Sequence, residues 1–579
     1  MPDGVSSSLY VDDLAVWFSG SRMSAVERRM QLALDRVSAW ADSKGFRFSA
    51  SKTVAMHFCR LRGVHPDPDL VLYGRRLSCV PEAKFLGLTF DSRLTWVPHL
   101  KSLKASCMKA LNLLRVLAHT SWGADCRTLL HLFRALVSSK LSYGSEVYSS
   151  GTESRLKTLD AVHHAGLRLA TGAFRSSPIP SLLVEAGIPP LDLVRQLHMV
   201  RCWLRIQRLP DSLVCLSVSR QACFSYYELH PRMPCPFAFR VRALLADYGL
   251  LEAQVSPVRL PRVAPWVLPE VSFCRFYEGS KDSVDPRHLH QLFLEHSTCH
   301  DGSVPIYTDG SKSSSGVGFG VVLPDFSRGG SLPINASIFT AELFAIVVAL
   351  KIVFAHSACR FTVFCDSQGA LLALESFNSS HPIILAILEW LFLIRRRGKN
   401  VDFCWVPAHV GVRGNEAVDA LARASSLRPA SAHCRLPASD LHAPLKVALS
   451  QHWQLRWDSV ANNKLREVSQ SVSARVYPAL PRRLETALVR LRIGHTRLTH
   501  GFLMCGGVQP FCDDCLVPLT VRHLLVECPS LGDIRRRLLF RHKSSDGSFC
   551  LSSVLGGVRG TPGTDLFLFL KEAGLLHLF

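Results

Sequence analysis

The stretch VPIYTDGSKSSSGVGFGVVL, residues 304–323, decides the fold of the central part of this 579-residue chain. Its two apolar segments, separated by a polar and glycine-containing turn, predict strands at Val304–Thr308 and Gly316–Leu323. A third strand is predicted at Leu332–Ala336. Three strands in immediate succession indicate a meander, which is one edge of a larger sheet.

Helices and strands alternate after this meander. The predicted elements are a helix at Thr340–His356, a strand at Arg360–Cys365, helices at Gly369–Ser376 and Pro382–Arg396, a strand at Val401–Val406 and a helix at Asn415–Ser425. A meander followed by this alternation predicts an α/β domain, a mixed five-stranded sheet with flanking helices, over residues 301–428.

Four acidic residues occupy informative places in this domain. Asp309 and Asp366 each follow an apolar strand segment, Glu342 opens the first helix, and Asp419 lies in the last one. Acids at strand ends and helix starts of one sheet can converge on one edge. Glu342 also interrupts an apolar helix, which costs stability unless the carboxylate is paired or binds a metal.

Phosphodiester hydrolysis is the chemistry that such a cluster suits. Two hard cations held by carboxylates activate a water and stabilise the leaving oxygen. Four acids without a thiolate favour Mg²⁺, with Mn²⁺ as the alternative ion. His409 lies in the loop before the last helix and is placed to shuttle a proton or help product leave. A lone acid is more simply a solvated strand end or cap, but the ordered set favours function.

These residues resemble the RNase H family. The matching motifs are YTDGS (307–311), TAE (340–342), CDSQ (365–368), WVPAHVG (405–411) and GNEAVD (414–419). The resemblance implies metal-binding catalytic roles for Asp309, Glu342, Asp366 and Asp419, with His409 assisting. It also implies endonucleolytic cleavage of the RNA strand of RNA–DNA hybrids, recognised partly through the 2′-OH. Ala408 stands where a glycine is common, and we expect little effect.

The first 95 residues form a second region, in which Tyr10-Val11-Asp12-Asp13 lies in a predicted hairpin turn. The hairpin is predicted at Leu9–Phe18 with its turn at residues 11–13, strands at Phe46–Phe58 and Lys84–Phe90, and a helix at Met23–Ser43. With the segments at 45–53 and 84–96, this resembles the end of the palm in reverse transcriptases of non-LTR retrotransposons. The alternative is an ordinary acidic turn.

Two-metal polymerisation needs a third carboxylate, and the strand that carries it in the family is missing here. We therefore expect Asp12 and Asp13 to be a polymerase relic in a partial α+β palm, without reverse transcriptase activity.

The remaining regions are mostly helical. Residues 96–250 resemble the thumb and connection that follow the palm, and four prolines between Val255 and Pro269 mark residues 251–300 as a linker. Residues 429–579 form a helical C-terminal region.

This C-terminal region contains a motif with the spacing C-x₂-C-x₇-H-x₄-C, formed by Cys512, Cys515, His523 and Cys528. The spacing suits one structural Zn²⁺, with Cys505 as a spare ligand. Four ordinary intracellular residues are the alternative.

Bulk properties agree with a nucleic-acid partner. The formal net charge is +21, and lysine and arginine neutralise phosphates. The 19 cysteines are an odd number, scattered in apolar contexts, which predicts reduced thiols and an intracellular protein, nuclear or cytoplasmic. Neither a signal peptide nor an uninterrupted membrane span is predicted.

The sequence leaves the oligomeric state open. A nucleic-acid-binding remnant without catalysis is the alternative to the nuclease, and a decayed gene product is the third.

Overall fold

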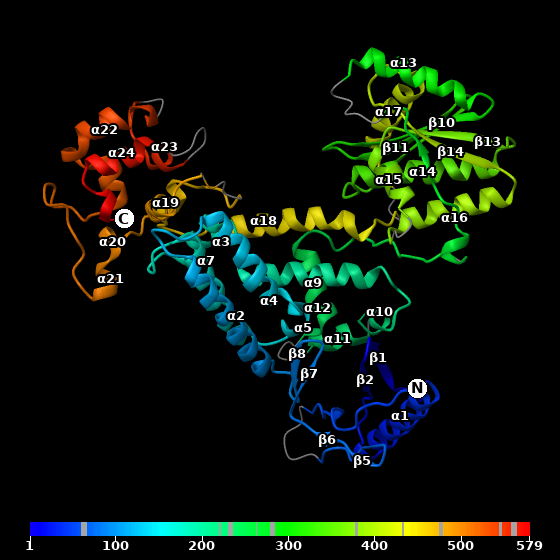
Figure 1. Ribbon diagram of the computed structural model, residues 1–579, viewed down its shortest axis with the longest axis horizontal. Coiled ribbons are helices and arrows are strands. Elements are labelled where there is room, and N and C mark those ends of the chain that lie inside the picture. Colours follow the sequence, from blue (N-terminus) through cyan, green and yellow to red (C-terminus); the bar gives the residue numbers. More distant parts are fainter. Residues whose placement is uncertain are drawn as a thin grey trace. The chain divides into compact units, whose positions relative to one another are not determined.

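The computed structural model describes residues 1–579 except 60–65, 219–221, 230–234, 262, 278–283, 377–379, 431–433, 474–476, 478, 544–546, 557–563 and 579 (Figure 1). The chain forms two compact units. Residues 1–198 and 452–579 form the first unit, and residues 199–451 form the second. The two ends of the chain therefore fold together. The boundaries fall inside helices α9 (Leu191–Gln207) and α18 (His442–Asp458).

A six-stranded sheet is the centre of the second unit. Its order is β12-β11-β10-β13-β14-β9, with antiparallel pairs among the first three strands and parallel pairs from β10 onward. The strands are β9 (Phe273–Cys274), β10 (Val304–Lys312), β11 (Val317–Leu323), β12 (Phe326–Leu332), β13 (Arg360–Cys365) and β14 (Asn400–Trp405).

The prediction of five strands was wrong by one. The sixth strand, β9, lies in the stretch that we interpreted as a linker, and Phe273 pairs with Phe403 of β14. Two residues are too short to give a strand pattern in the sequence. The third strand of the meander was also misplaced, because β12 ends at Leu332, the residue at which the predicted strand begins. Its middle residues are serine, arginine and glycine, so this edge strand is held by backbone pairing and lacks an apolar alternation.

Helices α14 and α17 cover opposite faces of this sheet. Side chains alternate between the two faces of a strand. On β11, Phe319 contacts Phe344 of α14, at 5.0 Å between ring centroids, whereas Gly318 and Gly320 lie against α17. The helices of the second unit, besides parts of α9 and α18, are α10 (Leu213–Val218), α11 (Ala222–Leu229), α12 (Phe237–Asp247), α13 (Pro286–Ser297), α14 (Ile338–Ala355), α15 (Gln368–Glu375), α16 (Pro382–Arg396) and α17 (Arg413–Ser426).

Among the described residues, α14 is the one helix long and apolar enough to cross a membrane, judged by length and composition only. Most of it is buried within the protein, where it packs against β10, β11 and α16. The same composition is expected for the central helix of an α/β core, because all of its faces meet other elements.

Short strand pairs and one long helix make up the N-terminal part of the first unit. The strands are β1 (Ser6–Tyr10), β2 (Asp13–Trp17), β3 (Val54–Ala55), β4 (Val71–Leu72), β5 (Arg75–Arg76), β6 (Ser78–Cys79), β7 (Glu82–Phe85) and β8 (Leu88–Asp91). Helix α1 (Met23–Ser43) has the predicted bounds. The strand predicted at Phe46–Phe58 is reduced to β3, and that at Lys84–Phe90 is a hairpin, whose turn residues Leu86 and Gly87 have φ of 46° and 82°.

Helices from both ends of the chain form the rest of the first unit. They are α2 (Val97–Leu117), α3 (Cys126–Phe133), α4 (Ser139–Ser142), α5 (Ser145–Tyr148), α6 (Glu153–Leu156), α7 (Asp160–Thr171), α8 (Ile179–Ala186), α19 (Arg482–Ile493), α20 (Arg497–His500), α21 (Phe502–Cys505), α22 (Gly532–Leu538), α23 (Leu551–Leu555) and α24 (Thr564–Glu572). Helix α19 packs against α7 and α8, and Arg492 meets Glu185 there in a buried ion pair, with Nε 3.1 Å from Oε2.

Candidate active site and metal centres

Two acids meet because neighbouring strands are parallel and in register. Thr308 of β10 pairs with Cys365, the last residue of β13, so the residues that follow them, Asp309 and Asp366, lie side by side. Asp309 is buried, and the backbone N–H of Gly310 donates to its Oδ1 over 2.8 Å. The edge of the sheet predicted to carry the site therefore carries both carboxylates.

The third acid, Glu342, comes from the N-terminal part of α14, just after its first turn. Gly310 allows this approach, because a Cβ at position 310 would lie 2.7 Å from the backbone nitrogen of Glu342. Glu342 is only 6% exposed, and its Oε2 is buried without a hydrogen-bond partner. A carboxylate oxygen left alone in the interior is costly, so this oxygen fits a ligand for a cation.

Burial and neighbouring negative charges raise the proton affinity of the three carboxyls. Burial, and then the charges of Asp366 and Asp419, raise the pKa of Asp309 to about 7. Burial, and then Asp366 and Asp309, raise the pKa of Glu342 well above its usual value. Burial also raises the pKa of Asp366, against the hydrogen bond from Asn415. A divalent cation would reverse these shifts, because it favours the ionised forms.

Asp419 approaches from α17, on the other face of the sheet. A Cβ at Gly318 would lie 2.4 Å from the carbonyl oxygen of Ala422, so only glycine lets α17 lie this close. Asp419 pairs with Arg423, one turn further along the helix, with Oδ2 2.8 Å from Nη2. Its charge acts on both Asp309 and Asp366, so the fourth acid lies near these two carboxyls.

His409 lies at the rim of this cluster. Its side chain is 68% exposed and its Nδ1 is 3.7 Å from Oδ2 of Asp419. The residue has φ of 60°, a left-handed conformation that a non-glycine residue adopts at a cost. The loop thus holds an accessible imidazole next to the carboxylates, where it can exchange protons with solvent.

Two supporting residues were not predicted as part of the site. The side chain of Asn415 is buried and hydrogen-bonds to Asp366, and the indole Nε1 of Trp405 donates to the Asp366 carbonyl oxygen over 3.1 Å. Both residues lie in the motifs that carry the family resemblance, which was the available signal. Their roles depend on contacts between distant segments, which the sequence does not show.

The model of the RNase H family matches residues 301–426, the segment that contains the sheet from β10 to β14 and all four acids. Residues 301–426 are an RNase H domain. The catalytic and metal-binding roles of Asp309, Glu342, Asp366, His409 and Asp419 remain predictions, which the convergence of these side chains supports.

Related proteins come from mobile elements. A 115 kDa protein in type-1 retrotransposable element R1DM of Drosophila melanogaster is 25% identical over 201 residues, which are 34% of this chain and 19% of that protein. The RNA-directed DNA polymerase from mobile element jockey of the same species is 26% identical over 177 residues, 30% and 18% of the two chains. A Pol polyprotein from type-1 retrotransposable element R1 4 of Nasonia vitripennis is 23% identical over 214 residues, 34% and 54%.

The chain thus matches between about a fifth and about half of the length of these relatives. These relatives are proteins of retrotransposable and mobile elements, and this chain with its RNase H domain is similar to them over part of their length.

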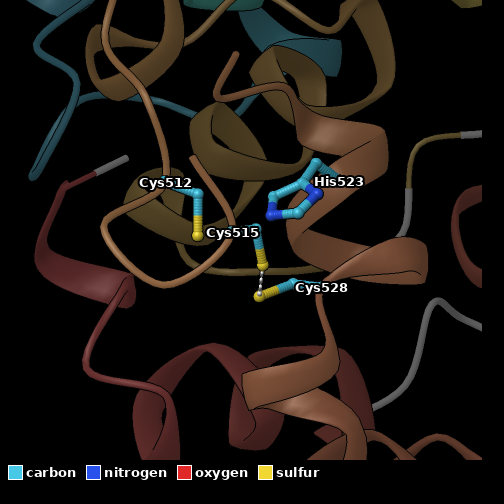
Figure 2. Close-up of side chains that lie close together, drawn as sticks. All are labelled: Cys512, Cys515, His523 and Cys528. Carbon is cyan, nitrogen blue, oxygen red and sulfur yellow. Dashed lines mark hydrogen bonds between the residues drawn. The ribbon is translucent and has the colours of Figure 1, made fainter. Parts of the chain in front are cut away.

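The predicted Cys/His cluster is assembled in the first unit. Figure 2 shows Cys512, Cys515, His523 and Cys528 around a common space, and one ligand atom of each lies within 4.8 Å of all the others. Cys515 Sγ and Cys528 Sγ are 3.9 Å apart. The spare candidate, Cys505, is exposed and lies outside this group.

Backbone geometry prepares this cluster for a cation. A tight turn brings Cys512 and Cys515 together, in which the Leu516 N–H donates to the Cys512 carbonyl oxygen over 2.9 Å. The hydrogen bond with His523, followed by backbone N–H groups of the turn, lowers the pKa of the Cys512 thiol. Arg535, buried in α22, donates to the Cys528 carbonyl oxygen over 3.0 Å. Three thiols and one imidazole at this spacing fit a closed tetrahedral site.

The acidic pair of the palm-like region stands apart from such a cluster. Asp12 lies in the turn of the β1–β2 hairpin and Asp13 begins β2, and both are exposed. Among the described residues, none of the groups arranged to hold a metal includes either acid. Their role as a polymerase relic stays a prediction.

Proposed function

We propose that the RNase H domain hydrolyses the RNA strand of RNA–DNA hybrids as an endonuclease. The observation that carries this proposal is the convergence of the buried Asp309 and Glu342 with the half-buried Asp366, and Asp419 lies near this group. Like charges are held together in a protein interior at a cost. A binding site for divalent cations offsets that cost, and this donor set of carboxylates fits Mg²⁺, or Mn²⁺ in its place.

The four acids would hold two such ions, which supply an activated water and stabilise the leaving oxygen when bound. Asn415 and Trp405 contribute by orienting Asp366, one at the side chain and one at the main chain. Arg423 holds the carboxylate of Asp419 on the face of α17 that meets the cluster.

His409 would move protons during the reaction. An exposed imidazole beside Asp419 can protonate the departing 3′ oxygen or carry a proton to solvent. Because its side chain is exposed and not packed in the core, it can follow the product out of the site. Hybrid recognition would use phosphate contacts and the RNA 2′-OH, supported by the net charge of +21. A nuclear or cytoplasmic location would give access to hybrids.

We propose in addition that Cys512, Cys515, His523 and Cys528 bind one structural Zn²⁺. The closeness of their ligand atoms and the lowered pKa of the Cys512 thiol support this. A metal here would fix the turn at 512–515 to the segment that begins at His523, within a small hydrophobic cluster.

The palm-like region is proposed to be inactive as a polymerase. Two-metal polymerisation requires three converging carboxylates, and Asp12 and Asp13 are two exposed acids at the tip of a hairpin. Template-directed incorporation of dNTPs by the purified chain would contradict this.

The test is cleavage of a labelled RNA–DNA hybrid by the purified chain with Mg²⁺, next to single-stranded RNA and duplex DNA. Asp366→Asn should abolish cleavage, whereas Asp325→Asn, which removes the same charge at an exposed turn between β11 and β12, should leave it intact. Absence of hybrid cleavage by folded wild-type protein would refute the nuclease. Hybrid binding without cleavage would favour the non-catalytic remnant.

A further inference from the structure

A second group of metal-binding side chains lies at the β9 edge of the RNase H sheet. We propose that Cys274, His296 and His300 form a Zn²⁺ site. One ligand atom of each lies within 4.8 Å of the other two. The site is separate from the carboxylates, and it belongs to the second unit, whereas the four-residue Cys/His cluster belongs to the first.

The local structure brings these three residues together. Cys274 ends β9, where it pairs with Cys404 of β14. His296 lies in the last turn of α13, and His300 in the 3₁₀ turn Thr298–His300 that continues it. Residues four apart share one face of a helix, so the two imidazoles project in the same direction. Their ring centroids are 5.4 Å apart.

Two buried nitrogen atoms without hydrogen-bond partners give the second argument for a metal. The Nε2 atoms of His296 and His300 are both buried without a hydrogen-bond partner. Aromatic rings surround them, since Phe276 is 5.7 Å from His296 and Phe364 is 6.1 Å from His300, measured between ring centroids. Buried polar atoms without partners are rare and costly, and a metal bound at both Nε2 atoms would explain them.

The donor set selects the metal. Two neutral imidazoles and one thiolate suit Zn²⁺, which is commonly four-coordinate, better than Mg²⁺, which prefers oxygen. Two further groups lie near the thiol, because Asp402 and Cys299 act electrostatically on Cys274. Cys299, Asp402 or a water would fill the fourth position.

The position of α13 indicates what the site would do. Phe293 of α13 belongs to a buried cluster with Phe364, Val406 and Val412. The same helix reaches the loop of His409, because Nδ1 of His290 lies 3.7 Å from the place a Cβ would occupy at Gly411. A metal bound by residues of both α13 and β9 would therefore fix the helix that packs against the His409 loop. It would attach this helix to an edge strand of only two residues.

Native mass spectrometry of the zinc-loaded full chain tests the site without any need for nuclease activity. Cys274→Ser and His300→Ala should each lower the bound zinc by one ion per chain. His288→Ala, an exposed residue of the same helix, and Cys359→Ser, an exposed cysteine of the same domain, should leave the count unchanged. Charge-state distributions in the same spectra report whether each variant is folded.

An unchanged zinc count in folded Cys274→Ser and His300→Ala would overturn the proposal. Loss of a zinc ion in Cys515→Ser alone would assign all zinc to the C-terminal cluster and would overturn it too. Hydrogen exchange gives a further readout, since removal of the metal should raise the exchange of amides in residues 401–412 in the wild type and not in Cys274→Ser. This expectation holds whether or not the carboxylates cut a hybrid.

Discussion

Proton binding by the buried carboxylates should make the Mg²⁺-free RNase H domain less stable as the pH rises. The pKa of Asp309 is raised from 3.8 to about 7 in the folded protein. A carboxyl whose pKa is higher in the folded than in the unfolded protein contributes its full stabilisation of the folded state at pH values below the unfolded-state pKa. That stabilisation is lost as the pH rises through the folded-state pKa. The interval of about three pH units, at ~1.4 kcal/mol per unit for one proton, gives a loss on the order of 4 kcal/mol.

Hydrogen exchange of the full chain in buffer without Mg²⁺ or Mn²⁺ measures this loss. The free energy of opening, taken from peptides that cover β10 and α14 after correction for intrinsic rates, should fall between about pH 4 and pH 7. Asp309→Asn removes the titrating carboxyl, so its slope should be shallower than that of the wild type. Asp325→Asn, in an exposed turn, should keep the wild-type slope.

Mg²⁺ should restore the lost stability most strongly near pH 8, because it binds the ionised carboxylates. An opening free energy that stays constant or rises between pH 5 and pH 7 in the Mg²⁺-free wild type would refute the reasoning. So would an equal slope in Asp309→Asn, since the burial of that carboxyl would then not be the cause.

Three further predictions concern packing and proton transfer. Gly318→Ala places a methyl group 2.4 Å from a carbonyl oxygen of α17, so hybrid cleavage should fall at least ten-fold, and unchanged cleavage would contradict the close approach. Glu185→Gln leaves the charge of Arg492 buried and should lower the free energy of unfolding of the first unit by about 3 kcal/mol, measured by urea denaturation, with the exposed Glu153→Gln as control. His409→Ala should lower the rate of hybrid cleavage by about 10²-fold while the Kd for the hybrid stays within a factor of two, and an equal loss of binding would assign the residue to recognition.

Local patterns determined much of the RNase H domain from the sequence. The bounds of β13 and α16 were predicted as observed, because apolar periodicity and a proline at the first turn mark them. The four acids and the loop histidine were selected by motif and order, and the structure brings them to one edge. The palm-like hairpin and α1 follow from the same kind of local signal.

Edge strands escaped this reasoning. β9 is two residues long, and the middle of β12 is serine, arginine and glycine. Each strand is held by backbone hydrogen bonds to the neighbouring strand of the sheet. Strand pairing of this kind depends on which partner edge is free, which the side chains of the strand do not encode.

The sequence by itself determined which side chains are available for chemistry, and the tertiary structure alone decided how they act. The raised pKa values at Asp309 and Glu342, the hydrogen bond from Asn415 to Asp366 and the meeting of Cys274 with His296 all arise from contacts between segments far apart in the chain. Burial and distance set these properties, and both exist only after α14, α17 and α13 have packed against the sheet.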